Sequence, residues 1–209
     1  MKKTLLLPLL IIFFPNNLLS DDAVSEDVEI EVVEIIGSQE EALEIAGAAT
    51  VINSDDLEVY EYTDIHKILS NVPGVNFRPE EGYGLRPNLS IRGTYADRSG
   101  KITLMEDGVL IAPAPYAASS AYYFPTAGRL AGVEVLKGPS AITQGPFTIG
   151  GAINLLSTPI PDETGGLFNQ EFGEDQTTRT HVHYGVSKDN VAFLIESHIW
   201  ETDGFDAIK

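Results

Sequence analysis

The sequence predicts a mixed α+β domain, in which a small sheet is combined with short helices, followed by longer antiparallel strands. Three observations predict this fold class. Short strand-like and helix-like segments alternate from Ala48 to Pro161. Glycine and proline separate them closely, most densely in VEVLKGPSAITQGPFTIGGAINLLS (Val133–Ser157). After Pro161 the segments become longer and alternate apolar with polar residues, which is the period of a strand.

Composition narrows the class of protein. The 209 residues carry 31 acidic against 13 basic side chains, a formal net charge of −18, and no cysteine. This acidic balance argues against a nucleic-acid partner. The hydrophobic fraction of 43% is that of a chain that buries a core. Without disulfides, an exported form of the chain depends on packing or on a membrane for its stability.

The first twenty residues, MKKTLLLPLLIIFFPNNLLS, read as a secretory signal peptide (1–20). Two lysines precede an apolar run that ends in two asparagines and the small residue Ser20, the order found in such signals. Two prolines interrupt the run, which is shorter than the roughly 20 apolar residues of a membrane-spanning helix. Cleavage is expected near Ser20 or Ala23.

Residues 21–47 are predicted to form a flexible N-terminal segment. Within it, VEIEVVEI (Val28–Ile35) alternates apolar and acidic residues, as a strand does. Such a strand can add to the sheet edge of another protein, or it can pair inside its own domain. The sequence leaves both interpretations open.

Residues 48–161 contain the predicted α/β elements. ATVIN is a strand, Ser54 is the expected cap of the helix SDDLEVY, and Thr63 is the expected cap of the helix TDIHKILSNVPG. The strands VNF, LSIRG and KITLMEDGVLI follow, the last with an Asp-Gly turn, and then VEVL and AINLL. Four glycines around these last two strands are expected to allow positive φ or close backbone approach: Gly138, Gly145, Gly150 and Gly151.

Residues 162–209 contain three segments of about ten residues with one apolar face. Val182, Tyr184 and Val186 share one face, opposite His181 and His183. This pattern is typical of a transmembrane β-barrel, and a soluble antiparallel sheet is the alternative.

Enzymatic chemistry finds no support in the sequence. A thiol nucleophile is excluded by the absence of cysteine, and phosphate-loop and dinucleotide motifs do not occur. His181 and His183 lie on one strand face and could bind a metal, but a polar pair facing the lumen is the preferred interpretation. The histidines form no familiar ligand set: His66, His181, His183 and His198.

Five motifs resemble, in order and spacing, the plug domain of TonB-dependent outer-membrane receptors. They are TDIHKILSNVPGV, LSIRG, LMEDGVLI, VEVLKGPSAITQG and IGGAINLLSTP, and the resemblance covers roughly Val33–Pro161. The segment APAPYAASSAYYFP is similar to the ferric-citrate-receptor branch. The resemblance implies a plug domain at 48–161 and the first strands of a 22-stranded barrel at 162–209. The chain is therefore expected to be the N-terminal part of a longer receptor.

The resemblance also implies a function. By this resemblance the protein is expected to be a TonB-dependent transporter in the cell outer membrane, in contact with the lipid of that membrane. The transporter is expected to import a ferric chelate such as a siderophore or ferric citrate. The expected partner is TonB with its inner-membrane energising complex, and no resident cofactor is expected. A secreted or periplasmic α/β binding module without a membrane role is the alternative.

Three groups of site residues follow from the resemblance. Four side chains in a TonB box at 28–35 are expected to contact TonB: Val28, Ile30, Val32 and Val33. Arg92 and Lys137 match the plug arginines that clamp barrel glutamates, and lysine departs from this pattern because it lacks the two-pronged guanidinium. An outward apex is expected from the loops Arg78–Asn88, Thr94–Gly100 and Ala112–Phe124, with six ligand-binding side chains: Arg86, Tyr95, Arg98, Tyr116, Tyr122 and Tyr123.

Overall fold

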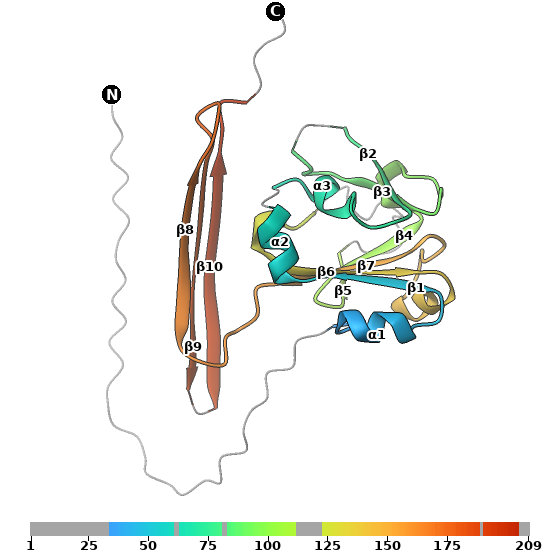
Figure 1. Ribbon diagram of the computed structural model, residues 1–209, viewed down its shortest axis with the longest axis horizontal. Helices are drawn as coiled ribbons and strands as arrows, with labels where there is room; N and C mark the ends of the chain where they lie inside the picture. Colours follow the sequence, from blue (N-terminus) through green and yellow to red (C-terminus); the bar gives the residue numbers. More distant parts are fainter. Residues whose placement is uncertain (1–33, 61–62, 81–82, 112–122, 189, 205–209) are drawn as a thin grey trace, which may run out of the picture.

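The computed structural model describes residues 34–60, 63–80, 83–111, 123–188 and 190–204. It contains an α/β unit and, beside it, an upright sheet of three long strands (Figure 1). No helix within these ranges is both long and apolar enough to cross a membrane. The predicted signal peptide and residues 28–33 lie outside the described part of the chain.

A five-stranded mixed sheet forms the centre of the α/β unit. β6 (Leu130–Lys137) and β7 (Gly151–Ser157) pair antiparallel in its middle, and β4 (Ile102–Glu106) runs parallel to β7. The edge strands are β1 (Ala48–Ile52), beside β6, and β5 (Val109–Leu110), beside β4. Segments predicted as separate strands thus form one sheet. Almost every residue of β6 and β7 is buried, as expected for strands covered on both faces.

Different elements cover the two faces of this sheet (Figure 1). α3 (Ile65–Leu69) and the hairpin of β2 (Val75–Arg78) and β3 (Asn88–Ile91) lie above it, and α1 (Gln39–Glu44) lies below. α2 (Ser54–Tyr60) lies on the side of the three-stranded sheet. Three short 3-10 helices complete the unit: η1 (Asp97–Ser99), η2 (Ala127–Arg129) and η3 (Pro139–Gln144).

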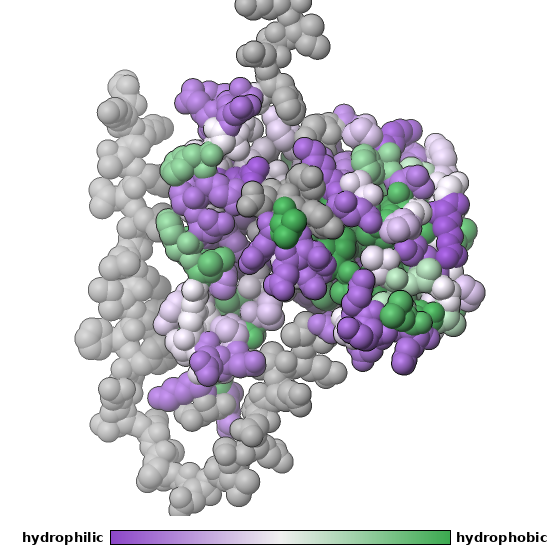
Figure 2. All heavy atoms as spheres, viewed as in Figure 1, coloured by the Kyte–Doolittle hydropathy of each residue, from purple (hydrophilic) through white to green (hydrophobic). Residues whose placement is uncertain are grey.

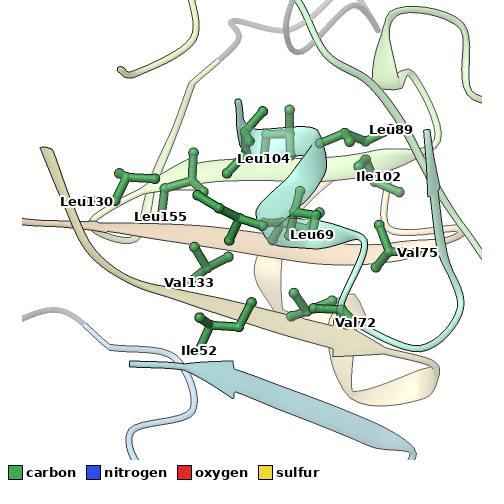
Figure 3. Packing of buried hydrophobic residues seen from close by; sticks show 14 of the residues in the cluster. Ile52, Leu69, Val72, Val75, Leu89, Ile102, Leu104, Leu130, Val133 and Leu155 are labelled. Atoms are coloured by element: carbon green, nitrogen blue, oxygen red, sulfur yellow. The ribbon is translucent and has the colours of Figure 1, made fainter. Parts of the chain in front are cut away.

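Two apolar clusters lie on opposite faces of the sheet, because alternate side chains of a strand point to opposite sides. The larger cluster joins the sheet to α3 and the β2–β3 hairpin, and it includes Leu69, Val133 and Leu155 (Figure 3). The smaller cluster lies on the other face, where Leu136 packs with Ile36. Burying a side chain of this size contributes about 1.5–3 kcal/mol. The two clusters therefore hold the unit together from both sides of β6.

The glycine-rich stretch makes the tight connections on either side of η3. Gly138 follows β6 with φ +109, and Gly151 begins β7 with φ +148. A Cβ on Gly151 would lie 2.2 Å from the backbone oxygen of Leu136, so no larger residue fits there. Gly150 is not among the glycines with positive φ. It is needed for close approach instead, since a Cβ there would lie 2.9 Å from Cγ2 of Ile102.

Capping explains where α1 and α2 begin. The predicted cap of α2 was wrong: Asn53, not Ser54, accepts from the N–H of Asp56 at 2.9 Å, and the Asp56 carboxylate accepts from the N–H of Asn53 at 3.3 Å. The acid three residues after Asn53 completes this reciprocal pair. α1 was not predicted at all. Its capping box joins Ser38 and Glu41, whose carboxylate accepts from the N–H of Ser38 at 2.8 Å.

The cap of α3 also differs from the prediction. The helix begins at Ile65, and Asp64, not Thr63, accepts from the N–H of His66 at 2.8 Å. Asp is a more common N-cap residue than Thr, and its negative charge is stabilised by the positive end of the helix dipole.

The three-stranded sheet separates apolar from polar side chains. β8 (Gly165–Phe172), β9 (Thr178–Lys188) and β10 (Val191–Glu201) are antiparallel neighbours in chain order. Hydrophobic residues lie at the surface along this sheet (Figure 2). The exposed face includes Phe168, Phe172, Val182, Tyr184, Phe193, Ile195 and Ile199. His181 and His183 lie on the other face, toward the α/β unit, as predicted.

We predict that Asp64→Ala weakens α3 and that Thr63→Ala does not. Losing an Asp cap costs about 1 kcal/mol, which corresponds to roughly fivefold faster hydrogen exchange of the α3 amides. The measurement compares both variants in the full-length protein. Equal exchange in the two variants would show that Asp64 is not the cap.

Candidate functional site

The two predicted clamp residues meet at one corner of the α/β unit. Lys137 ends β6 and is 5% exposed. Its Nζ donates to Oγ1 of Thr50 at 3.0 Å and to the backbone oxygen of Pro73 at 3.1 Å. Burial, and secondly the charge of Arg92, lower the pKa of Lys137. The ammonium is therefore held by neutral oxygens and destabilised by a neighbouring cation.

The backbone places Arg92 beside Lys137. Arg92 follows β3 with φ +54, and its N–H donates to the oxygen of Gly74 at 2.8 Å. A Cβ on Gly138 would lie only 3.2 Å from Nη1 of Arg92, so glycine leaves room for the guanidinium. Among the described residues, no carboxylate lies within ion-pair distance of Arg92 or Lys137. This corner can accept an anionic group.

The first two predicted apex loops are joined by ion pairs. Arg98 contacts Glu80 at 3.1 Å, and Arg78 contacts Asp97 at 3.0 Å and Glu80 at 3.6 Å. The N–H of Arg98 donates to Oδ1 of Asn88 at 2.8 Å, which fixes the loop to the start of β3. Arg98, predicted to meet a ligand, is therefore already paired with a carboxylate.

The predicted ligand-binding residues do not all lie together in the structure. Arg86 is exposed and Tyr95 is 68% exposed, and both belong to these two loops. Tyr116 and Tyr122 lie outside the described residues. The prediction of one shared apex was wrong for Tyr123. The loop of Tyr123 precedes β6, whose first residues pair with the last residues of β7. Because β7 runs parallel to β4, Tyr123 lies at the end of β4, whereas Tyr95 precedes the start of β4.

A polar network surrounds Tyr123 at this end of β4. Oη of Tyr123 donates to Glu106 at 2.8 Å, and Arg129 donates to the same carboxylate and to Oη at 3.2 Å. Burial, and then the bond to Glu106, raise the pKa of Tyr123. Tyr123 therefore serves an internal contact between a loop and β4.

The same network reaches the three-stranded sheet at Glu196 on β10. Oγ1 of Thr158 donates to Oε1 of Glu196 at 2.6 Å, and Nε2 of His181 lies 2.8 Å from the same oxygen. Nη1 of Arg129 lies 4.0 Å from Oε2. Glu196 thus collects contacts from the α/β unit and from its own sheet.

The histidines form a row rather than a ligand set. The rings of His181 and His183 are 5.5 Å apart, and those of His181 and His198 are 5.6 Å apart. Within the described ranges, no group of three His, Asp or Glu side chains has the geometry to hold a metal ion. His66 belongs to the core, where its ring stacks on Phe77.

A cavity of about 460 Å³ separates the α/β unit from the three-stranded sheet. Leu57 and Ile68 line it on one side, and Arg179, His181 and His198 line it on the other. Its mixed lining suits water or a polar solute, and its volume is in the range of small-molecule sites.

Comparison with known proteins identifies the fold. Residues 41–152, more than half of the chain, match the family model of the TonB-dependent receptor plug domain. The chain belongs to this family. The α/β unit is therefore the plug, and the resemblance predicted from its motifs is confirmed at this level.

Individual relatives carry different cargoes. The vitamin B12 transporter BtuB of Vibrio vulnificus (strain CMCP6) is 28% identical over 170 residues, 78% of this chain and 26% of the relative. The unliganded ferric citrate transporter FecA has a TM-score of 0.64 at 24% identity, over 79% of this chain and 27% of that chain. The siderophore receptor PirA from Acinetobacter baumannii has a TM-score of 0.58 at 23% identity, over 76% and 25%. The structural likenesses define the fold alone, and the chain spans about a quarter of these relatives.

Sequence reasoning missed the junction residues. Glu106 was assigned to a turn, and Arg129 and Glu196 received no role. The signal available was weak: an acid at an inward position of a strand that carries other polar residues, as at Glu196. Its partners Thr158 and Arg129 are distant in sequence, so only the fold brings them together.

We predict that Glu196→Gln loosens the plug from the three-stranded sheet. The amide oxygen can still accept from Thr158 and His181, but without the negative charge these bonds weaken, and the NH₂ group replaces the oxygen that faces Arg129; together this costs about 1–3 kcal/mol. Urea-dependent protease access to the plug measures the effect. Glu201→Gln, on the exposed face of the same strand, is the control and should stay within about 0.5 kcal/mol. Equal shifts would exclude Glu196 as a junction.

We predict that wild-type stability rises with pH relative to Lys137→Met. The lowered pKa of Lys137 means that the folded protein releases this proton before the unfolded chain does. The free energy of unfolding therefore rises between that lowered pKa and the ordinary lysine value of 10.5. Urea unfolding from pH 7 to above this window tests the sign. A pH-independent difference between the two proteins would contradict it.

Proposed function

We propose that the chain is the N-terminal part of a TonB-dependent transporter in the cell outer membrane, with the plug as its gate. The placement of the elements supports this proposal: Ile36 and α1 lie on one face of the plug sheet, and the β2–β3 hairpin lies over the other (Figure 1). The exposed apolar face of β8–β10 suits lipid, and its polar face suits a lumen.

The proposed energy source is TonB, captured by the strand at 28–35. Val28, Ile30, Val32 and Val33 are the proposed contacts, the first three of them at alternating positions, and main-chain hydrogen bonds supply the affinity of an added strand. The described structure begins at Glu34, directly after these residues.

The proposed cargo is a ferric chelate of the citrate type. Arg86, Arg98 and Tyr95 offer cations and an amphipathic ring at the apex. Arg98 is paired with Glu80, but both side chains are partly exposed. Such surface pairs contribute only about 0–1 kcal/mol, so an anionic chelate can replace Glu80 at low cost. The net charge of −18 opposes an anion only weakly at physiological salt, where the Debye length is about 8 Å.

Cobalamin is the second candidate cargo, because a curated relative is a vitamin B12 transporter. The exposed ring of Tyr95 would suit that ligand as well. The arginines of the apex distinguish the two, since cobalamin offers them no comparable cluster of carboxylates.

We predict that iron-limited growth on ferric citrate requires the gene, and that the triple variant Arg86→Ala, Tyr95→Ala, Arg98→Ala abolishes the benefit by losing the contacts to the chelate. The control is Leu43→Ala, an exposed residue on α1 below the sheet. Growth that needs the gene for cobalamin but not for ferric citrate would refute the cargo and retain the transporter. Growth independent of the gene with every substrate tried would refute the transporter.

A further inference from the structure

A buried carboxylate on β6 binds the N-terminal segment. Glu134 is 0% exposed, and three successive backbone N–H groups donate to it. Ile35 donates to Oε2 at 2.9 Å, and Ile36 and Gly37 donate to Oε1 at 2.7 and 2.9 Å. The side-chain amide of Asn154 on β7 donates to Oε2 at 2.8 Å. Four donors thus occupy the two oxygens.

The carboxylate and the segment depend on each other. A buried carboxyl group is tolerated only where hydrogen bonds replace its hydration. Within the described ranges, no Lys, Arg or His lies within ion-pair distance of Glu134. The N–H groups of residues 35–37 are therefore three of its four compensating partners. Removing the segment would leave Glu134 buried with Asn154 alone.

Residues 35–37 hold the beginning of the described chain on the sheet. Ile36 is 8% exposed and belongs to the apolar cluster that contains Leu136. Glu134 lies in the middle of the sheet, opposite Val51 of β1 and Asn154 of β7. Counted from Glu34, the first described residue, the first contacts with the sheet are those of residues 35–37.

We propose that Glu134 is the force-bearing anchor through which a pull on the N-terminal strand enters the plug sheet. The inference rests on the proposed function in one respect, that TonB applies the pull. Because Glu134 also binds Asn154, the load passes to β6 and β7 together. Release of residues 35–37 breaks three of the four hydrogen bonds of Glu134 at once, so the anchor sets the tension at which the plug begins to rearrange.

The test is Glu134→Gln in the full-length receptor. Glutamine keeps the shape but turns a donor toward the N–H groups. Hydrogen exchange at Ile35, Ile36 and Gly37 should become at least tenfold faster. Pulling on a cysteine introduced at Glu26 should give a first release at lower force, and TonB-dependent uptake of ferric citrate should fall about tenfold while ferric citrate binding persists.

Glu41→Gln is the matched control. Glu41 belongs to the same segment, but its carboxylate bonds only within the cap of α1, to Ser38. This variant should keep the wild-type release force and uptake. Ile35→Pro removes one donor and leaves Glu134 in place, and it provides a second variant if Glu134→Gln does not fold. Because Ile35 also packs against the smaller cluster, its readouts are exchange at Ile36 and Gly37 and the release force, not overall stability.

Each outcome is decisive. Unchanged exchange at residues 35–37 would refute the anchor, and faster exchange with unchanged release force would refute its mechanical role. The cysteine handle does not involve TonB. A lowered release force in a receptor whose wild type shows no TonB-dependent uptake would therefore retain the anchor and refute the proposed function.

Discussion

The antiparallel pairing of β6 with β7 is the constraint on which the rest of the plug depends. β6 also pairs with β1, and β7 also pairs with β4, so these two strands connect the whole sheet. Consecutive residues of β6 face opposite sides of the sheet and contact different elements. Val133 packs toward α3, and Glu134 binds residues 35–37. A one-residue change in register would exchange these faces and bury the carboxylate in the apolar cluster. The register of one strand therefore decides where every covering element lies.

Polar contacts in this protein differ in strength according to burial. The apex pairs of Arg78 and Arg98 are partly exposed, and such pairs contribute about 0–1 kcal/mol. Glu134, by contrast, is fully buried, and leaving a buried acceptor without its donors costs about 1–3 kcal/mol or more for a charged group. The apex can therefore exchange partners while the centre of the sheet stays intact. A gate that binds a solute at its surface requires this difference.

The sequence predicts the sheet well because its strands carry local signals. VEVL and AINLL are apolar runs bounded by glycine, and they form the middle of β6 and of β7. α1 also had a local signal, the capping spacing of Ser38 and Glu41, but its six residues are too few for an apolar period to show. The missed helix was thus predictable from its cap alone.

The site residues were harder to predict because they depend on contacts between distant segments. Glu134 reads as one acid in a strand, and its donors are 97 to 99 residues away. Tyr123 was grouped with Tyr95 because both were expected in loops at the same end of one sheet, but β3, which precedes Tyr95, belongs to the separate two-stranded sheet. The pairing of β6 with β7, and of β7 with β4, decides that question, and composition does not encode it.

The two faces of the plug meet in β6, and this has a consequence for gating. A ligand at the proposed apex would act on β2 and β3, which pack through the larger cluster on Val133 and Val135. The proposed pull on the N-terminus would act on Glu134, which lies between those two valines on the same strand. Coupling between two sites requires an element whose state both sites bias. A single strand contacted at adjacent residues from both faces meets this requirement without any large movement between the sites.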